Sequence, residues 1–237
     1  SIFPNNWIST HQDGTVVTYP MWAPSRRLER REDIIEKLQQ LGYRVAHRVD
    51  YGRFEAEEKF LEGTGSMILD RENLLAYACV SARTDKDLFA DFCQTFGFRP
   101  VIFTASQTTE EGGLAEIYHT NVMMSVGENI AILCDEAIRD TKEKQMVNDL
   151  LRESGKEVIH ISEAQCNHFA GNMLQVRNDA GEKILVMSEQ AYRSLSEQQL
   201  RLIEAHCRIL HSPLYTIEAC GGGSARCMMA EIFLPGP

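Results

Sequence analysis

Three absences narrow the class of protein that this sequence of 237 residues can encode. No apolar run approaches the roughly 20 residues that a membrane-spanning helix needs, so a membrane protein is not expected. Basic residues are scarce, with 24 Lys and Arg against 34 Asp and Glu and a formal net charge of −10. Sequence-independent binding to nucleic acid or to an anionic membrane surface requires a basic surface, so neither partner is expected.

The cysteines lack the pairing that a metal site would show. Seven are present and none forms a C-x-x-C pair, so we expect neither a structural zinc site nor any other metal. An odd number of scattered cysteines in a chain of this length is typical of reduced thiols in a cytoplasmic protein. Most of them are expected to be buried as small hydrophobic residues.

Four segments carry apolar residues at helical spacing and end at a typical helix stop. They are residues 31–41, 84–96, 140–154 and 196–207. Each is followed within a few residues by a short strand and is preceded by a strand–turn–strand pattern. The unit strand–strand–helix–strand therefore recurs without a low-complexity linker between copies. This repetition predicts a ring of similar sectors within one domain, residues 1–237, instead of two unrelated domains.

A polar or reactive residue stands where the first strand of each unit begins. These residues are Asn6, Glu62, His119, Asn172 and Cys227, at successive spacings of 56, 57, 53 and 55 positions. A ring of sectors would bring all of them to one central axis. Cys, His and Glu side chains together are the groups that thiol catalysis needs. The spacing therefore predicts a catalytic site on the axis.

Cys227 is the candidate nucleophile of this site. It follows consecutive glycines at 221–223, whose backbone can approach a ligand closely at an entropic cost that a structural segment would avoid. Arg226 or His119 is expected to favour the thiolate, and His119 is the candidate general acid and base. Glu62 would orient the imidazole. The alternative is that residues 221–223 form a plain loop and that Cys227 is a core thiol.

Seven short motifs extend this pattern over essentially the whole chain. They are Phe3-Pro4-Asn5-Asn6-Trp7, residues 26–31, Glu62-Gly63-Thr64-Gly65-Ser66, Ser81-Ala82-Arg83-Thr84, His119-Thr120-Asn121, Ala170-Gly171-Asn172 and residues 221–227. Together they resemble the guanidino-group-modifying enzymes of the pentein superfamily, most closely the citrulline utilisation hydrolases. The resemblance implies an α/β fold, a five-bladed pseudo-symmetric β/α-propeller. It implies Cys227 as nucleophile, His119 as acid and base, Glu62 as orienting carboxylate, and no cofactor.

The resemblance also implies how substrate is bound. In relatives, an Arg of the Ser-x-Arg-Thr segment binds the substrate carboxylate, which corresponds to Arg83 here. Arginine-deiminating relatives carry Asp at the position of Asn6, and many carry another at the position of Asn121. A buried carboxylate facing a neutral ureido group would be unpaired, whereas an amide both donates and accepts hydrogen bonds. These amides, with Asn172 as a further substrate contact, favour hydrolysis of citrulline to ornithine, ammonia and carbon dioxide.

Two alternatives to citrulline hydrolysis stay open. One keeps the same Cys, His and Glu and takes arginine, methylated arginine or agmatine, with an acid such as Asp13 supplying the charge. The other is a non-catalytic pentein that acts by binding, as the ribosome anti-association factors do. Both the citrulline hydrolase and the arginine-directed hydrolase would bind a small-molecule amino acid or its amine. The formation of a homo-oligomer stays open.

The end of the repeat carries one further expectation. The first strand of the fifth unit is expected to end at Phe233-Leu234-Pro235, and no helix follows it. In the pentein fold, segments from the N-terminus close the ring. We therefore expect this sequence to lack its true N-terminus.

Overall fold

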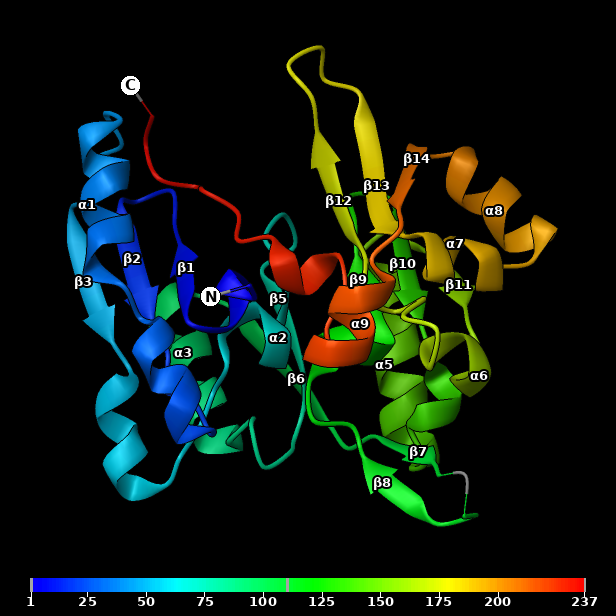
Figure 1. Ribbon diagram of the computed structural model, residues 1–237. Coiled ribbons are helices and arrows are strands. Elements are labelled where there is room, and N and C mark those ends of the chain that lie inside the picture. The colour runs from blue at the N-terminus through cyan, green and yellow to red at the C-terminus, as the bar shows by residue number, and fades with distance from the viewer. Residues whose placement is uncertain (1, 110, 237) are drawn as a thin grey trace.

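A computed structural model describes residues 2–109 and 111–236 of the chain (Figure 1). Four three-stranded sheets follow one another and share one topology. In each, the first two strands pair antiparallel, and the second and third pair in parallel across a helical connection. The sheets comprise β1 (Ile8–Thr10), β2 (Thr15–Thr18) and β3 (His47–Asp50); β4 (Ile68–Asp70), β5 (Leu75–Cys79) and β6 (Arg99–Phe103); β9 (Met124–Val126), β10 (Ile130–Leu133) and β11 (Glu157–His160); and β12 (Leu174–Arg177), β13 (Lys183–Ser188) and β14 (Arg208–Ser212).

Each sheet has an amphipathic helix between its second and third strands, as the apolar spacing predicts. These helices are α1 (Glu32–Gln40), α3 (Lys86–Phe96), α5 (Thr141–Glu153) and α8 (Glu197–Glu204), the last preceded by α7 (Glu189–Ser194). The predicted start of α3 at Thr84 is wrong. The side chain of Asp85 accepts the backbone N–H groups of Asp87 and Leu88, so Asp85 is the N-cap. Gly97, in the left-handed region, ends the helix.

The hydrophobic core lies between the sheets and these helices. Its largest cluster joins the second, third and fourth sheets and includes Phe103, Leu133 and Met187. A second cluster contains Phe89 and Phe92 of α3, and a third surrounds Trp7 beside α1. Burial of one face of each sheet against one stripe of a helix holds the sectors together.

The arrangement of these sectors is the predicted α/β pentein propeller, with one local difference in the fifth sector. Residues after η5 (Arg226–Met228) form no strand within the described part of the chain, so the prediction of a fifth first strand is wrong. A strand requires a ladder of backbone hydrogen bonds with a neighbour, and no such ladder joins this segment to a described strand. It is held instead by the first sector: Phe233 N–H donates to Thr10 Oγ1 at 2.7 Å, and Arg44 N–H donates to Pro235 O at 3.0 Å.

Short helical turns stand where the sequence analysis placed the strand starts, and three of them lie immediately before β1, β4 and β9. They are η1 (Pro4–Asn6), α2 (Gly63–Ser66), α4 (Thr120–Met123) and η5. α2 packs against both η1 and α4, and η1 packs against η5, so these turns meet at the centre (Figure 1). This contact between turns brings residues from the whole chain to the axis.

The remaining elements lie outside this repeated pattern. They are η2 (Pro24–Glu29), η3 (Gly52–Glu57), η4 (Asp135–Ala137), α6 (Glu163–Cys166), α9 (Tyr215–Gly221) and a hairpin of β7 (Ser106–Thr108) and β8 (Leu114–Glu116). The hairpin, which projects from the sheets in Figure 1, was not predicted from the sequence. Among the helices of residues 2–109 and 111–236, none has the length and apolar character needed to span a membrane.

Candidate active site

The structure brings the five predicted axial residues together. Asn6 Nδ2 donates to the backbone oxygen of Glu62 at 3.5 Å, and Glu62 Oε2 lies 2.7 Å from His119 Nε2. Asn172 Nδ2 is 3.2 Å from Cys227 Sγ, and the backbone oxygen of Asn121 accepts from the same Nδ2 at 2.9 Å. All five axial side chains are buried. These contacts form two buried groups, Asn6–Glu62–His119 and Asn121–Asn172–Cys227, and the segment from His119 to Asn121 joins them.

Two glycines of α2 make this convergence possible. A Cβ added at Gly65 would lie 2.2 Å from Asn6 Nδ2 and 3.0 Å from His119 Nδ1. Gly63 has a φ of +49°, and a Cβ there would lie 2.3 Å from the backbone oxygen of Asn5. Side chains at either position would push η1 or the imidazole away. These two glycines therefore allow α2 to pack closely against η1 and His119.

Glu62 is a fully buried carboxylate with several donors. Its Oε2 faces His119 Nε2, and its Oε1 accepts the backbone N–H of Trp22 at 2.9 Å. Burial alone would raise the pKa of Glu62. The hydrogen bond and charge of His119, the Trp22 amide and the charge of Arg83 outweigh burial and lower that pKa to about 2. Glu62 is therefore ionised near neutral pH.

The imidazole of His119 is neutral near neutral pH, and it carries the charge that acts on Glu62 only at lower pH. Burial lowers its pKa below the ordinary value of 6.5, against the opposing effect of Glu62. The contact with Glu62 assigns the proton to Nε2, because a carboxylate can only accept. Nδ1 then carries the lone pair, on the side of the ring that faces Gly65 and Asn6. This tautomer is ready to take a proton from a thiol or a water molecule.

Amide groups surround the thiol of Cys227. Asn121 Nδ2 lies 3.3 Å and Asn172 Nδ2 lies 3.2 Å from Sγ. Asn172 Oδ1 accepts the backbone N–H groups of Arg226 at 3.1 Å and of Cys227 at 3.4 Å, which fixes the amide orientation. Gly223 allows a close approach, because a Cβ there would lie 3.2 Å from Cys227 Cβ. Both amides therefore direct an N–H donor at Sγ.

Arg226 does not take the role that its place in the sequence suggested. Its guanidinium donates to the backbone oxygen of Met229 at 2.8 Å and pairs with Glu231 at 3.0 Å. These contacts hold it away from the thiol, so the expectation that Arg226 favours the thiolate is wrong. The neighbouring position in sequence was misleading, because successive side chains of the η5 turn point in different directions.

Arg83 lies beside the carboxylate of Glu62, at the exposed side of the site. Its Nη1 is 3.5 Å from Glu62 Oε2, and its guanidinium lies 5.2 Å from the ring of Trp22 and 5.0 Å from that of Tyr118. Arg26 Nη1 is 3.7 Å from the same Oε2. Sequence reasoning missed Trp22, Tyr118 and Arg26. The available signals were the aromatic residue Tyr118 directly before His119 and the place of Arg26 in the motif at residues 26–31.

Three buried amide atoms near this site have no hydrogen-bond partner among the described residues. They are Asn121 Oδ1 and both Oδ1 and Nδ2 of Asn5. An unpaired buried polar group costs about 1–3 kcal/mol, so such atoms mark positions where a ligand would supply partners. Asn5 was not singled out from the sequence, although it precedes Asn6 in the first motif.

Neither the acid Asp13 nor a metal-binding cluster is part of this site in the described residues. Asp13, the acid invoked for the arginine alternative, lies in the turn after β1, at the opposite end of that strand from Asn6. Within the described ranges, no group of three or more His, Cys, Asp or Glu side chains is arranged to hold a metal ion. Glu62 is therefore the carboxylate that directly contacts this site's residues.

A propeller with a Cys, His and Glu on its axis defines the chain as a member of the pentein superfamily. The family described as "N,N dimethylarginine dimethylhydrolase, eukaryotic" matches residues 1–234. The chain therefore belongs to this family. No curated protein matches the sequence.

Solved structures with low sequence identity share the fold. Apo ArgZ, an arginine dihydrolase from the ornithine-ammonia cycle in cyanobacteria, is 18% identical with a TM-score of 0.72, over 99% of this chain and 33% of that chain. The chain thus spans about a third of the length of ArgZ. The N-terminal domain of an ArgZ variant, covalently bound to a reaction intermediate, is 19% identical with a TM-score of 0.72, over 99% of this chain and 77% of that one. A dimethylarginine dimethylaminohydrolase adduct with 4-chloro-2-hydroxymethylpyridine is 17% identical with a TM-score of 0.61, over 95% and 76%.

Proposed function

We propose that this chain is a thiol-dependent hydrolase that cleaves a terminal C–N bond in the guanidino group of an arginine-derived amino acid. Nω,Nω-dimethylarginine is the substrate we favour, because the chain belongs to a family described by that reaction. The observation that carries the proposal is the placement of Cys227 Sγ between two amide donors, one of which belongs to Asn121, in the same short segment as the His119 that contacts Glu62. Hydrolysis of the substituted C–N bond gives citrulline and dimethylamine.

The reaction proceeds through a covalent adduct on Cys227. The thiolate attacks the central guanidino carbon, forming a C–S bond, and the proton from the thiol goes to His119 Nδ1. The imidazolium, held by Glu62, returns this proton to the departing dimethylamine as the C–N bond breaks. A water molecule, deprotonated by the same imidazole, then attacks the carbon. Loss of the thiolate leaves citrulline and restores the enzyme.

Substrate is positioned by groups whose hydrogen-bonding capacity is still open. Arg83, stacked between two aromatic rings and partly exposed, takes the α-carboxylate, which also draws it away from Glu62. Asn121 Oδ1 is buried without a partner among the described residues and accepts an N–H of the guanidino group. The negative thiolate offsets the charge of the guanidinium.

Citrulline, the substrate preferred from the sequence, is the second candidate. The side chains in contact with Cys227 Sγ are the neutral amides of Asn121 and Asn172. Glu62, the nearby carboxylate, is already engaged by His119, Arg83 and Arg26. A neutral ureido group suits this environment, and its hydrolysis gives ornithine, ammonia and carbon dioxide.

Product analysis with three separate substrates tests the proposal. The protein is incubated with dimethylarginine, arginine or citrulline, and dimethylamine, ammonia, citrulline and ornithine are quantified. We expect dimethylamine and citrulline from dimethylarginine, lost in Cys227→Ser and retained in Cys220→Ser, which changes a nearby exposed thiol. Turnover of citrulline alone would favour the second candidate. Turnover of none of the three by folded protein would contradict both.

A further inference from the structure

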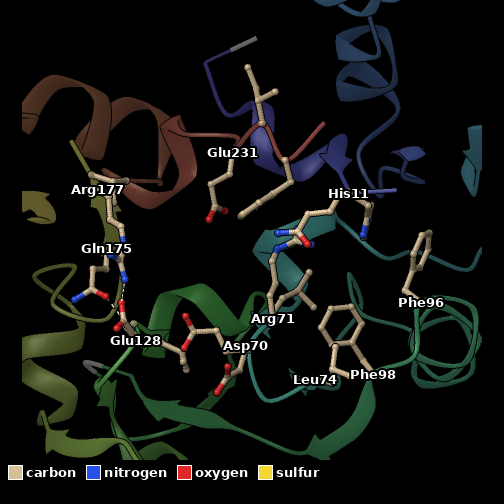
Figure 2. A pocket seen from close by; sticks show the side chains of 18 of the residues that line it. His11, Asp70, Arg71, Leu74, Phe96, Phe98, Glu128, Gln175, Arg177 and Glu231 are labelled. Atoms are coloured by element: carbon tan, nitrogen blue, oxygen red, sulfur yellow. Dashed lines mark hydrogen bonds and ion pairs between the residues drawn. The ribbon is translucent and has the colours of Figure 1, made fainter. Parts of the chain in front are cut away.

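A large cavity lies at the far end of the propeller axis from Cys227. The first strand of each sector begins at the active-site turns and leads to this far end. Turns and segments that follow β1, β4, β9, β12 and η5 surround a space of about 840 Å³ (Figure 2). None of the proposed catalytic residues lines it. The volume is in the range of small-molecule binding sites, and the charges in it that form no ion pair indicate what it could bind.

Arg71 is a cation in this cavity that forms no ion pair with a described residue, although the charge of Glu231 acts on it and opposes the lowering of its pKa by burial. Its Nη2 donates to the backbone oxygen of Thr10 at 3.3 Å, and its guanidinium lies 4.0 Å from the ring of Phe233. It forms no ion pair with any residue in the described ranges, although it is partly buried. The stacking and the single hydrogen bond fix the guanidinium while leaving most of its donors open.

Glu231 presents a carboxylate to the same cavity. One of its oxygens pairs with Arg226 at 3.0 Å, and the other accepts no hydrogen bond from a described residue. Figure 2 shows Glu231 and Arg71 reaching into the cavity from different segments, and they form no ion pair with each other. Two opposite charges are thus held in place with space between them. Such preorganisation reduces the entropic cost of binding a ligand that carries both complementary charges.

The other buried or paired charges of the cavity wall are already compensated. Glu128 pairs with Arg177 and Lys183, and Asp70 pairs with Lys156 at 3.1 Å. They offer a ligand little net attraction. Arg71, which forms no ion pair with a described residue, is therefore one group that selects what binds. The other is the second carboxylate oxygen of Glu231, because only the first oxygen pairs with Arg226.

The remaining wall disfavours a simple anion. Asp13 and Glu72 line the cavity together with Glu231 and would repel a ligand that carried only negative charge. Leu74, Phe96 and Phe98 give the wall an apolar side. The matching ligand has a carboxylate, an ammonium group and an apolar body.

We propose that this cavity is a binding site for a free α-amino acid, separate from the active site. The carboxylate binds Arg71, the ammonium group binds the open oxygen of Glu231, and an apolar side chain lies toward Phe98. Because the site is at the far end of the axis, its occupant does not compete with the substrate of Cys227.

Isothermal titration with L-leucine and two analogues tests this charge requirement on the wild-type protein. The analogue 4-methylpentanoate lacks the ammonium group, and 3-methylbutylamine lacks the carboxylate. We expect L-leucine to bind with a Kd below about 1 mM and each analogue to bind at least about tenfold more weakly. Absence of leucine binding would overturn the proposal. Equal binding of 4-methylpentanoate would also overturn it, because it would indicate a site for simple anions.

Variants at Arg71 and at Arg83 show whether leucine binds in the far cavity or in the active site. Arg71→Gln should weaken leucine binding at least about tenfold, with partial recovery in Arg71→Lys, while Arg83→Gln should leave it unchanged. Circular dichroism checks the fold of each variant, and the analogue series on wild-type protein does not depend on it. Loss of binding in Arg83→Gln with retention in Arg71→Gln would place leucine in the active site and overturn the proposal.

Discussion

The two ends of the propeller axis are built from the same repeated sectors but hold their charges in different ways. At the active-site end, the carboxylate of Glu62 is completely buried. It accepts a hydrogen bond from the Trp22 amide and lies within ion-pair distance of His119, Arg83 and Arg26. At the far end, Arg71 is held by one hydrogen bond and one ring, and it forms no ion pair with a described residue. A closed network keeps reacting groups in fixed geometry, whereas an open charge favours the exchange of a ligand.

The largest expected effect comes from breaking the closed network. Glu62→Gln and His119→Ala should each lower kcat by about 10²–10⁴-fold, because the general acid and base is misoriented or lost. Arg177→Gln, on the wall of the far cavity, should leave kcat within about twofold of wild type. Steady-state kinetics on the substrate found by product analysis measures all three. A similar loss in Arg177→Gln would remove the distinction between the two ends.

A smaller loss should follow from crowding the active-site end. In Gly65→Ala, the new Cβ would lie 2.2 Å from Asn6 Nδ2 and 3.0 Å from His119 Nδ1, so the amide and the imidazole must move. A displacement of about 1 Å in a catalytic group costs up to about 10²-fold, so we expect kcat to fall about 10–100-fold. Gly113→Ala in the β7–β8 turn is the control, since among the described residues only Thr109 Oγ1, at 3.3 Å, lies near its Cβ. Equal kcat in the two variants would contradict the packing argument.

A change in substrate preference should be smaller still. Asn121→Asp places a carboxylate within reach of Cys227 Sγ, which Asn121 Nδ2 approaches to 3.3 Å. The ratio of kcat/KM for dimethylarginine over citrulline should rise about tenfold, because the cationic head gains a partner and the neutral one does not. Asn167→Asp, on the surface, should leave the ratio unchanged. A ratio that falls in Asn121→Asp would show that the guanidino group is not held near this residue.

The change with the smallest expected effect on activity concerns stability in acid. The two ends of the axis should lose folding free energy in different pH ranges. His11, at the far cavity, has its pKa lowered from 6.5 to about 4, first by burial and then by Arg71. The unfolded chain binds the proton of this imidazole more readily than the folded protein does. His11 therefore contributes up to about 3 kcal/mol to the free energy of unfolding above pH 6.5, and this contribution is lost as the pH falls toward 4. The pKa of Glu62 is lowered to about 2, so its contribution is lost only between about pH 4.5 and 2.

Urea unfolding at a series of pH values resolves these two steps. His11→Gln should reduce the loss between pH 6.5 and 4 and leave turnover at neutral pH unaltered. His119, whose pKa is also lowered by burial, accounts for the part of that step that remains. If His11→Gln loses as much stability in this range as wild type, His11 is not the group that titrates.

The sequence predicted the positions on the axis but not the directions of the neighbouring side chains. The spacing of Glu62, His119 and Cys227 could be interpreted because each sector repeats the same local patterns of helix and strand. Arg226 was misassigned because the direction of its side chain depends on the η5 turn and on Glu231. The fifth strand was predicted from local pattern alone, whereas a strand also needs a neighbour for its ladder.

The far cavity was not predicted from the sequence at all. Arg71 resembles any polar residue of a β-hairpin turn, and only the folded chain places it near Phe233 and Thr10. Likewise, Trp22 is 40 positions from Glu62, and its backbone contact follows no periodicity. Contacts of this kind depend on how sectors meet, which residue patterns within one sector do not encode.

The most direct test of the active-site account is to trap the covalent adduct. Wild-type protein is mixed with dimethylarginine, quenched in acid within the first turnovers, digested and analysed by mass spectrometry. The account predicts an adduct equal to the substrate minus dimethylamine on the peptide that contains Cys227, and none in Cys227→Ser. An adduct on Cys220, or dimethylamine release that continues in Cys227→Ser, would contradict it.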